Sequence, residues 1–272
     1  MKNGIHFISG LPRSGSTLLS ALLRQNPKVH AGVTSPVGAL VLGALREMSG
    51  ANEGSVFIDD ARRKAVLRGL IQGYYDDIHP HKTVLDTNRI WCSKFPTLRQ
   101  IYPDGKIICC VRDMPWIYDS FERLIQRNAL MPSRIFGFEA SGTVYDRFEA
   151  LNRSNGLVGF AWTGLRQAYY GSDASRLLLV TYETLTQRPA RALEAIYSFL
   201  GLPAFKHDFE NIAFDVSDFD NYLGTPGLHA VGSRIAAAAP RRTVLPPELF
   251  NRVSGDSFWK DPSQNTHGAN IV

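Results

Sequence analysis

The feature that most constrains the fold is a short turn near the N-terminus that links an apolar run to an apolar helical pattern. Residues 5–8 are mainly apolar, residues 10–17 read GLPRSGST, and residues 18–23 read LLSALL. This order predicts a strand, a glycine-containing turn and the start of a helix. Such a junction directs backbone N–H groups and the positive end of a helix dipole at one point, so it favours a bound phosphate or sulfate group.

The cation in this turn is displaced from its position in loops that bind nucleoside triphosphates. Gly10 and Gly15 have the spacing of a Walker-type P-loop, but Ser16 stands where such a loop has lysine. Arg13, three residues earlier, is the cation that the turn provides instead. This shift favours an anion other than a nucleoside triphosphate.

The size and composition of the chain suit one globular domain. Its 272 residues, of which 44% are hydrophobic, can bury a core of ordinary size. We therefore predict a single α/β domain over residues 1–272, with the polar residues 261–272 as a mobile tail. The formal charge of +5 is compatible with an anionic ligand. No lysine- or arginine-rich block is present, which argues against nucleic acid as a partner.

Hydropathy and cysteine content indicate in which cellular compartment the protein is expected. The first predicted strand begins within a few residues of Met1, and no apolar run approaches the ~20 residues that span a bilayer. We therefore expect a soluble cytoplasmic protein with no integral membrane segment. Cys92, Cys109 and Cys110 are an odd number and include an adjacent pair in an apolar run, so free buried thiols are expected. The oligomeric state has no signal in the sequence.

Strand-like and helix-like patterns alternate along the chain. Four runs have the composition of strands: residues 5–8, 83–86, 106–111 and 176–182. Helical periodicity occurs after residue 17 and in residues 37–48, 61–77, 93–102, 158–170 and 189–200, and it also follows Pro115. This alternation predicts right-handed βαβ units, and therefore a P-loop-type, doubly wound parallel sheet flanked by helices. Residues 131–152 show no strong pattern and are a candidate cover for the site.

A second candidate anion site follows the most apolar strand. Residues 106–111 read KIICCV, as expected for a strand buried on both faces of a parallel sheet. The end of this strand delivers Arg112 to the crevice where an open α/β sheet binds its ligand. Arg112 can bind a phosphate through two donors, and Ser120 in the next helix can add another. Arg112 could instead pair with a carboxylate, but together with Arg13 it favours a ligand with two separated anionic groups.

Four sequence blocks together resemble the sulfotransferase superfamily that uses 3'-phosphoadenosine 5'-phosphosulfate (PAPS), and most of all its protein-tyrosine sulfotransferase branch. Residues 12–18 are similar to the family's 5'-phosphosulfate loop. Arg112 with Ser120 is similar to its 3'-phosphate site, and Tyr182 to a tyrosine that contacts the nucleotide. A weaker C-terminal block places Arg252 where that branch has lysine.

The resemblance implies transfer of a sulfuryl group from PAPS to an acceptor hydroxyl, phenol or amine, a tyrosine among them, with release of the bisphosphate PAP. It assigns a catalytic role to Arg13 and requires no metal. The acceptor would be a small molecule or a peptide. The residues expected to bind the nucleotide are Arg13, Ser14, Gly15, Ser16, Thr17, Arg112, Ser120, Tyr182 and Arg252.

The chain departs from that branch where a general base is needed. Residues 30–36 read HAGVTSP and contain no carboxylate at the place of the branch's catalytic glutamate. Residues 86–89 read DTNR and lack its catalytic lysine, although Arg89 supplies a cation nearby. The acceptor pocket is expected from residues 35–48, residues 131–152 and the C-terminal third. The candidate bases are His30, Glu47, Asp86 and His229.

Two other functions are compatible with parts of the pattern. A P-loop kinase that uses ATP and Mg²⁺ would need lysine at position 16 and an acidic metal ligand at the end of a buried strand. The chain has Ser16 and Arg112 at these places. A nucleotide-binding protein without catalysis is the other alternative, because no base occupies the matching position.

Overall fold

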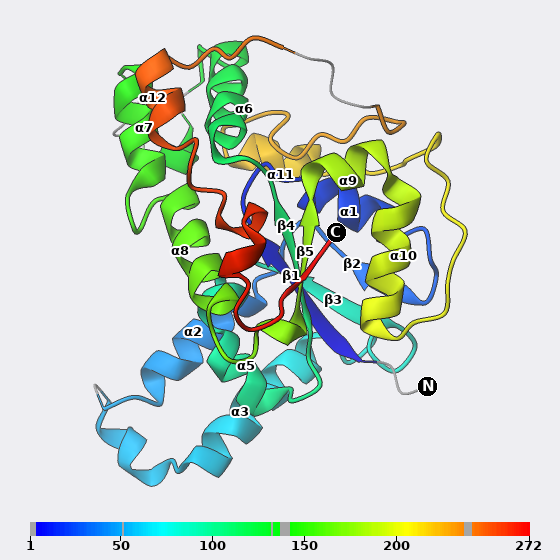
Figure 1. Cartoon of the computed structure of the whole chain (residues 1–272). Coiled ribbons are helices and arrows are strands. Elements are labelled where there is room, and N and C mark those ends of the chain that lie inside the picture. The colour runs from blue at the N-terminus through cyan, green and yellow to red at the C-terminus, as the bar shows by residue number, and fades with distance from the viewer. Residues whose placement is uncertain (1–3, 51, 132, 137–141, 237–240) are drawn as a thin grey trace.

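A single parallel sheet forms the centre of the computed structural model, which describes residues 4–50, 52–131, 133–136, 142–236 and 241–272. The strand order is β2-β3-β1-β4-β5-β6, and every neighbouring pair is parallel. Helices lie on both sides of the sheet (Figure 1). The doubly wound α/β fold predicted from the sequence is therefore confirmed.

The four predicted strands are present, and two short strands were not predicted. The strands are β1 (Ile5–Gly10), β2 (Val29–Ala31), β3 (Thr83–Thr87), β4 (Ile107–Val111), β5 (Leu177–Thr181) and β6 (Asn270–Ile271). β1 lies between β3 and β4, so the chain passes from one side of β1 to the other after β3. The crevice that such a reversal creates lies beyond the carboxyl ends of β1 and β4.

Two apolar layers cover the two faces of the sheet. The helices are α1 (Ser16–Leu23), α2 (Val37–Glu47), α3 (Asp60–Tyr74), α4 (Ile90–Ser93), α5 (Phe95–Ile101), α6 (Met114–Arg127), α7 (Val144–Asn152), α8 (Leu157–Tyr169), α9 (Tyr182–Gln187), α10 (Pro189–Leu200), α11 (Ser217–Tyr222) and α12 (Pro247–Arg252). Successive strand residues face opposite sides, so Phe7 belongs to the apolar layer that includes residues of α4, α5, α6 and α8, whereas Ile8 belongs to the layer that includes residues of α1 and α10. All five residues of β4 are buried, as predicted for a central parallel strand.

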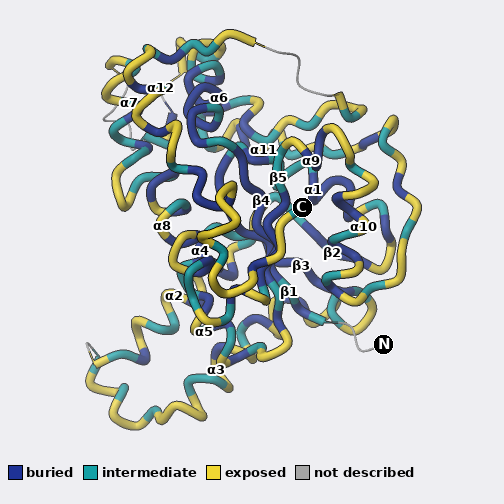
Figure 2. The backbone as a smooth tube through the Cα atoms, in the orientation of Figure 1, coloured by how far each residue is buried: buried dark blue, intermediate teal, exposed yellow. Residues whose placement is uncertain are grey.

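Helices α2 and α3 form an arm that extends from the body of the molecule (Figure 1). The residues of this arm are mostly exposed or half-buried, whereas buried residues are concentrated in the sheet and the helices against it (Figure 2). No helix in the described part of the chain is long and apolar enough to cross a membrane. The three cysteines are free and buried, as predicted, and Sγ of Cys92 lies 3.5 Å from Sγ of Cys109.

The end of the chain differs from its prediction. Residues 261–272 were expected to form a mobile tail, but Asn270–Ile271 pairs with β5 as strand β6. Residues 131–152 were expected to lack a strong element, yet they contain α7, whose N-terminus is closed by reciprocal hydrogen bonds between Thr143 and Asp146. Residues 132 and 137–141 of that segment, and residues 237–240, lie outside the described residues.

Candidate functional site

The turn between β1 and α1 has the backbone conformation of an anion-binding loop. Gly10 and Gly15 have φ of 99° and 94°, and a Cβ at Gly10 would lie 2.4 Å from the carbonyl oxygen of Cys110. Arg13, with φ of 57°, is the one described non-glycine residue in the left-handed region. Gly15 caps α1 without a side chain, so the first amides of this helix remain available to a ligand.

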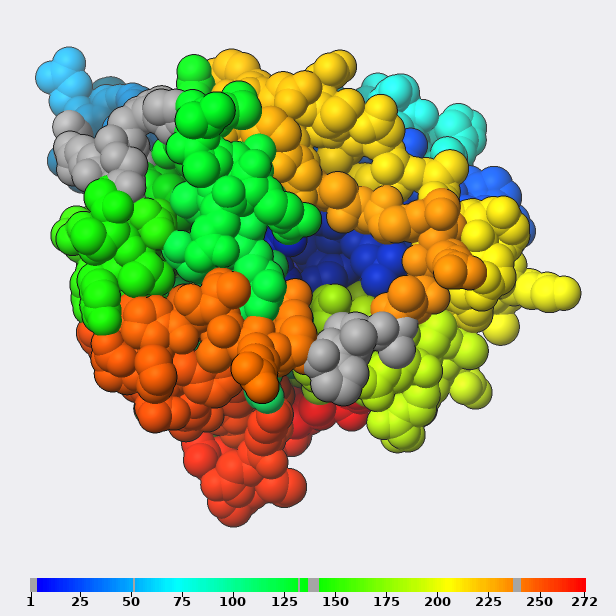
Figure 3. Space-filling view, turned by 90° about the horizontal axis from the view of Figure 1, so that it is seen from above, coloured from blue at the N-terminus to red at the C-terminus, as the bar shows by residue number. Residues whose placement is uncertain are grey.

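A cavity of about 400 Å³ lies over this turn at the carboxyl ends of the strands. In the space-filling view, N-terminal residues form the floor of a hollow bordered by segments from later in the chain (Figure 3). No carboxylate side chain lines the cavity among the residues that the structure describes. Seven arginines line it: Arg13, Arg89, Arg112, Arg123, Arg127, Arg234 and Arg241. This donor pocket, as we call it below, is therefore strongly cationic.

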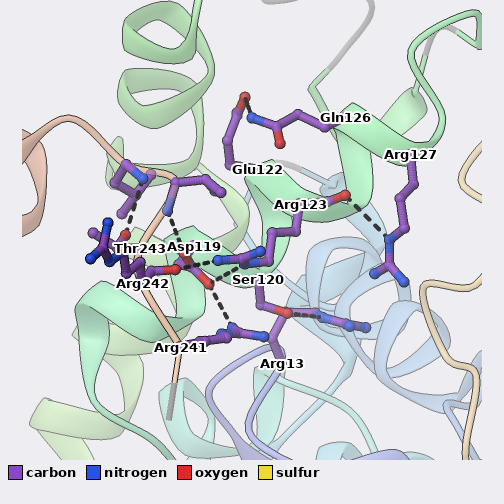
Figure 4. Close-up of polar contacts among 12 residues, drawn as sticks. Arg13, Asp119, Ser120, Glu122, Arg123, Gln126, Arg127, Arg241, Arg242 and Thr243 are labelled. Carbon is purple, nitrogen blue, oxygen red and sulfur yellow. Dashed lines mark hydrogen bonds and ion pairs between the residues drawn. The ribbon is translucent and has the colours of Figure 1, made fainter. Parts of the chain in front are cut away.

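The structure brings most of the predicted nucleotide residues together in the donor pocket. The Nε of Arg13 donates to Oγ of Ser120 at 3.0 Å (Figure 4). Arg112 donates to the backbone oxygen of Arg13 at 3.3 Å, and its guanidinium lies 4.0 Å from the centre of the Tyr182 ring. Gly15, Ser16 and Thr17 also line the pocket.

Two details of this arrangement differ from the sequence-based picture. Arg13 and Arg112 were expected at two separated anion sites, but both border one cavity, and Arg13 contacts Ser120 directly. Ser14 is buried below the pocket, where its hydroxyl donates to the backbone oxygen of Pro12 at 3.2 Å. Any contribution of Ser14 to ligand binding would therefore come from its backbone amide.

The positive charge of the arginines in the donor pocket is not balanced by carboxylates in its described lining. Burial, together with the nearby Arg112 and Arg127, lowers the pKa of Arg13 to about 10. Burial likewise lowers the pKa of Arg112, and its buried Nε has no hydrogen-bond partner among the described residues. A buried donor without a partner is costly, so this nitrogen is suited to an anionic ligand.

Arg252, predicted to bind the nucleotide, lies apart from the other predicted residues. Its guanidinium, in α12, forms an ion pair with Glu149 of α7 and lies 5.3 Å from the ring centre of Phe148. Arg252 does not line the donor pocket. Its two partners on α7 hold the side chain there, and this contact was not predicted because α7 was not predicted.

A cation that the sequence-based site omitted comes from the segment after residue 240. Asp119 of α6 is fully buried and accepts from Nε of Arg123 at 3.0 Å and from a terminal nitrogen of Arg241 at 2.6 Å (Figure 4). Its other oxygen accepts from the backbone N–H of Val244 at 2.9 Å. Asp119 therefore fixes residues 241–244 against α6 and directs two arginines toward the donor pocket. The i, i+4 spacing of Asp119 and Arg123 was a sequence signal for the contact within α6.

Asp86, a candidate base, is held by a network outside the donor pocket. Its carboxylate accepts from the hydroxyls of Ser35 and Tyr75 at 2.5 Å each, and from the indole N–H of Trp91 at 2.6 Å. Burial raises the pKa of Asp86, while these three hydrogen bonds lower it. Since all of these partners belong to the fold, we assign Asp86 a structural role.

Only one of the other three candidate bases lies at the site. His30 of β2 packs against the ring of Tyr75, with ring centres 5.6 Å apart, and Glu47 accepts from the side chain of Asn52 at the surface. Neither residue lines the donor pocket, whereas His229 does. His229 therefore is the candidate base that the fold brings to the cationic cavity.

A second cavity of about 230 Å³ adjoins the donor pocket. Four residues line both cavities: Ser16, Arg89, Leu228 and His229. Acceptor-binding residues were expected from three segments of the sequence. Residues 131–152 contribute Ile135 and the C-terminal third contributes several residues, but the segment 35–48 contributes none of the described lining.

Comparisons with known proteins indicate the family of the chain. A model of the Sulfotransferase family matches residues 6–207. Protein-tyrosine sulfotransferase 1 of Danio rerio is 26% identical over 203 residues, which cover 72% of this chain and 53% of that protein. Protein-tyrosine sulfotransferase 2 of Gallus gallus is 26% identical over 204 residues, which cover 72% of this chain and 50% of that protein. The chain therefore spans about half the length of these curated relatives.

Solved structures share the fold at low sequence identity. The sulfotransferase domain from the curacin biosynthetic pathway has a TM-score of 0.59 at 15% identity, covering 92% of this chain and 96% of that one. A sulfotransferase from Alicyclobacillus acidocaldarius has a TM-score of 0.50 at 14% identity, covering 82% and 90%. The match of the family model over most of the sequence, on a fold shared with these structures, shows that the chain belongs to the sulfotransferase family.

Proposed function

We propose that the protein transfers a sulfuryl group from PAPS to a hydroxyl, phenol or amine of an acceptor. The observation that carries this proposal is the donor pocket, where seven arginines and the start of α1 surround a cavity without a described carboxylate. A ligand with several anionic groups would supply the missing counter-charge. PAPS carries a phosphosulfate and a separate 3'-phosphate, so its charge suits this cavity.

The residues present fit such a donor. Arg13 and the backbone amides of residues 14–17 would hold the phosphosulfate, and Arg112 with Ser120 would hold the 3'-phosphate. The unpartnered Nε of Arg112 supports the second assignment. Tyr182, at the start of α9, would contact the nucleotide beside Arg112. When bound, PAPS supplies a sulfuryl group on a phosphate leaving group.

The protein would act mainly by positioning and electrostatic stabilisation. Negative charge builds on the bridging oxygen as the bond to the leaving phosphate breaks. Arg13 and the amides at the start of α1 would stabilise this charge, because they are fixed in place by the loop and need little reorganisation. Burial makes these interactions stronger than they would be in water.

The kinase alternative fits the pocket less well. A kinase would require a cation at position 16 and a carboxylate to hold Mg²⁺. Ser16 lines the donor pocket, and the described residues around it include no carboxylate. The pocket is therefore better suited to a metal-free anionic donor than to Mg-ATP.

Calorimetric titration with PAP and with Mg-ATP tests the nature of the donor. We expect PAP to bind, and Mg-ATP to bind at least tenfold more weakly, because the cavity provides cations for the 3'-phosphate but no described carboxylate for the metal. Tight binding of Mg-ATP without binding of PAP would refute the proposal. Incubation with ³⁵S-labelled PAPS and a panel of phenols, alcohols, sugars, amines and tyrosine peptides would then separate an enzyme from a non-catalytic nucleotide-binding protein.

A further inference from the structure

The residues that line both cavities form a wall between them. The transferred group would cross from one cavity to the other at this wall. Ser16, Arg89 and His229 line both the donor pocket and the second cavity. Ser16 is the first residue of α1, directly after the turn that would hold the phosphosulfate. Group transfer requires the attacking and leaving oxygens to be in line about the sulfur. An acceptor in the second cavity would approach the sulfur across this wall.

We propose that the second cavity binds a small, uncharged and mainly apolar alcohol or phenol, and that His229 accepts the proton of its hydroxyl. The inference rests on the proposed function, because it places the acceptor relative to the donor pocket. It goes further in naming the class of acceptor and the base, neither of which follows from membership of the family.

The lining of the second cavity indicates the acceptor class. Most of its side chains are apolar, among them Leu11, Val33, Ile135, Leu157, Phe219 and Leu223. Arg89 is the one Lys or Arg side chain in the described lining, no carboxylate joins it, and it also faces the donor pocket. A cationic amine would be repelled by Arg89 and would find no counter-charge among these residues. An apolar body with one hydroxyl fits this surface.

The volume of the second cavity suits an acceptor with a single ring. A cavity of about 150 Å³ holds benzene. The second cavity, of about 230 Å³, therefore has room for one ring with its substituents. A simple phenol or a short alcohol fits this space, whereas the main chain of a peptide, or the several hydroxyls of a sugar, would place polar groups against its apolar side chains.

Asp220 holds His229 in the orientation that a base needs. The Nδ1 of His229 lies 2.6 Å from Oδ1 of Asp220, whose Oδ2 accepts from the backbone N–H of His229 at 2.8 Å. Because a carboxylate accepts hydrogen bonds, the proton resides on Nδ1, and Nε2 keeps its lone pair. Asp220 lies in α11 and is only 2% exposed, so this pairing is rigid. The arrangement leaves Nε2 as the proton acceptor of a side chain that lines both cavities.

The surroundings keep the imidazole neutral near pH 7. Burial lowers the pKa of His229 below its usual value, and Arg89 and Arg13 lower it further, while Asp220 raises it. Arg89 also has no hydrogen-bond or ion-pair partner for its guanidinium among the described residues. It is placed to stabilise the sulfuryl oxygens at the wall, where the new bond would form.

The proposed step conserves atoms and charge. The acceptor oxygen forms a bond to sulfur as the bond between sulfur and the bridging oxygen of the 5'-phosphate breaks, and the electron pair of the broken bond stays on that phosphate. The acceptor proton moves to Nε2 of His229. No oxidant, reductant or metal enters the balance.

Binding of matched probes to the PAP-saturated protein tests the acceptor class. 4-Methylphenol is the side chain of tyrosine without its peptide, so we compare it with a tyrosine-containing heptapeptide, N-acetylglucosamine and benzyl alcohol by calorimetry. We expect 4-methylphenol and benzyl alcohol to bind at least tenfold more tightly than the peptide and the sugar. Preference for the peptide or the sugar, or no binding by either small probe, would overturn the inference. Failure of PAP itself to bind would instead overturn the proposed function.

A cavity-filling variant locates the probe. Leu157 begins α8 and lines the second cavity, so Leu157→Trp should weaken binding of 4-methylphenol at least tenfold and change binding of PAP less than twofold. Leu130→Trp, at a site that is 97% exposed, is the control and should change neither. Unchanged binding of 4-methylphenol in Leu157→Trp would place the acceptor elsewhere.

The role of His229 is tested by a variant and by two pH titrations. His229→Gln should slow single-turnover transfer from PAPS to 4-methylphenol by roughly 10²- to 10⁴-fold, with both ligands still bound within threefold. The fall in rate on the acid side, which should begin below the usual pKa of histidine, should disappear in this variant. Nuclear magnetic resonance should find the pKa of His229 below 6.5, with the proton on Nδ1, and Asp220→Asn should change both. A retained rate, or an unchanged acid limb, would refute His229 as the base.

Discussion

At the scale of single residues, Arg112 is the least satisfied group of the donor pocket. Its guanidinium is held by the Tyr182 ring and by one contact to the backbone of Arg13, and its Nε has no partner among the described residues. Its position follows directly from the sequence, because Arg112 is the first residue after β4. A cation fixed by the fold, rather than by a carboxylate, is available to a ligand.

Arg112→Ala should therefore weaken binding of PAP. Hydrogen bonds to charged groups contribute about 1.5–3 kcal/mol, which corresponds to a rise in Kd of roughly 10- to 150-fold. Arg112→Lys should recover part of the affinity, because lysine keeps the charge but loses the planar pair of donors. Arg252→Ala is the matched control, and calorimetry should find its Kd within about twofold of the unchanged protein. Equal affinity in Arg112→Ala would refute the assignment of the 3'-phosphate site.

At the scale of elements, α6 connects the donor pocket to a distant part of the chain. Asp119 on this helix binds Arg123 within the helix and Arg241 from the segment that follows residue 240. About one turn further along the same helix, Glu122 binds Arg147 of α7 at 2.7 Å. The two buried carboxylates thus have similar partners, but only the partners of Asp119 line the donor pocket.

This pair of carboxylates allows a controlled test of positioning. Asp119→Asn should weaken PAP binding by about three- to tenfold and reduce the salt dependence of that binding, because Arg123 and Arg241 lose the group that orients them. Asp119→Asn and Glu122→Gln should lower the melting temperature by similar amounts. Glu122→Gln, however, should leave the Kd for PAP within twofold. Titration at several salt concentrations, together with thermal unfolding, separates the two effects. Equal changes of Kd in both variants would show that Asp119 acts only through stability.

The elements also show which helices and strands could be predicted from the sequence alone. Helix α10 begins and ends where its periodicity, Pro189 and Gly201 predicted, because local signals define both ends. Strands β2 and β6 have three and two residues, too few for any periodicity to be visible. The capping box at Thr143 that begins α7 is a local signal, and it was present in the sequence but not recognised.

The candidate site was predictable where it depends on strand ends and not where it depends on long-range contacts. Arg13, Arg112 and Tyr182 each lie at the carboxyl end of a strand, so the parallel sheet brings them together. Asp220 was not predicted because it lies in a segment of weak periodicity, and only the fold shows that it pairs with His229. The ion pair of Arg252 was not predicted for the same reason, since its partner Glu149 belongs to an element that had not been recognised.

At the scale of the whole molecule, folding lowers the pKa values of several histidines. Burial is the first cause that lowers the pKa of His6, His30, His207 and His229. For each of them, the unfolded chain takes up a proton at a higher pH than the folded protein does. Their contribution to stability is therefore complete above about pH 6.5 and is lost as the pH falls. Asp86 acts in the opposite direction, because burial raises its pKa.

The contribution of His6 to the pH dependence of stability can be measured separately. Its pKa is lowered to about 4 by burial and by Lys106, and its Nδ1 accepts the backbone N–H of Lys106 at 3.3 Å. Protonation at this nitrogen would break the contact between β1 and the residue that precedes β4. Between pH 6.5 and 4, His6 should reduce the free energy of unfolding by at most about 1.4 kcal/mol per pH unit. Urea unfolding at pH 7 and pH 5 should therefore show a smaller pH-dependent loss in His6→Gln than in the unchanged protein or in His267→Gln at an exposed position. An equal loss in all three proteins would mean that His6 is not the group that titrates.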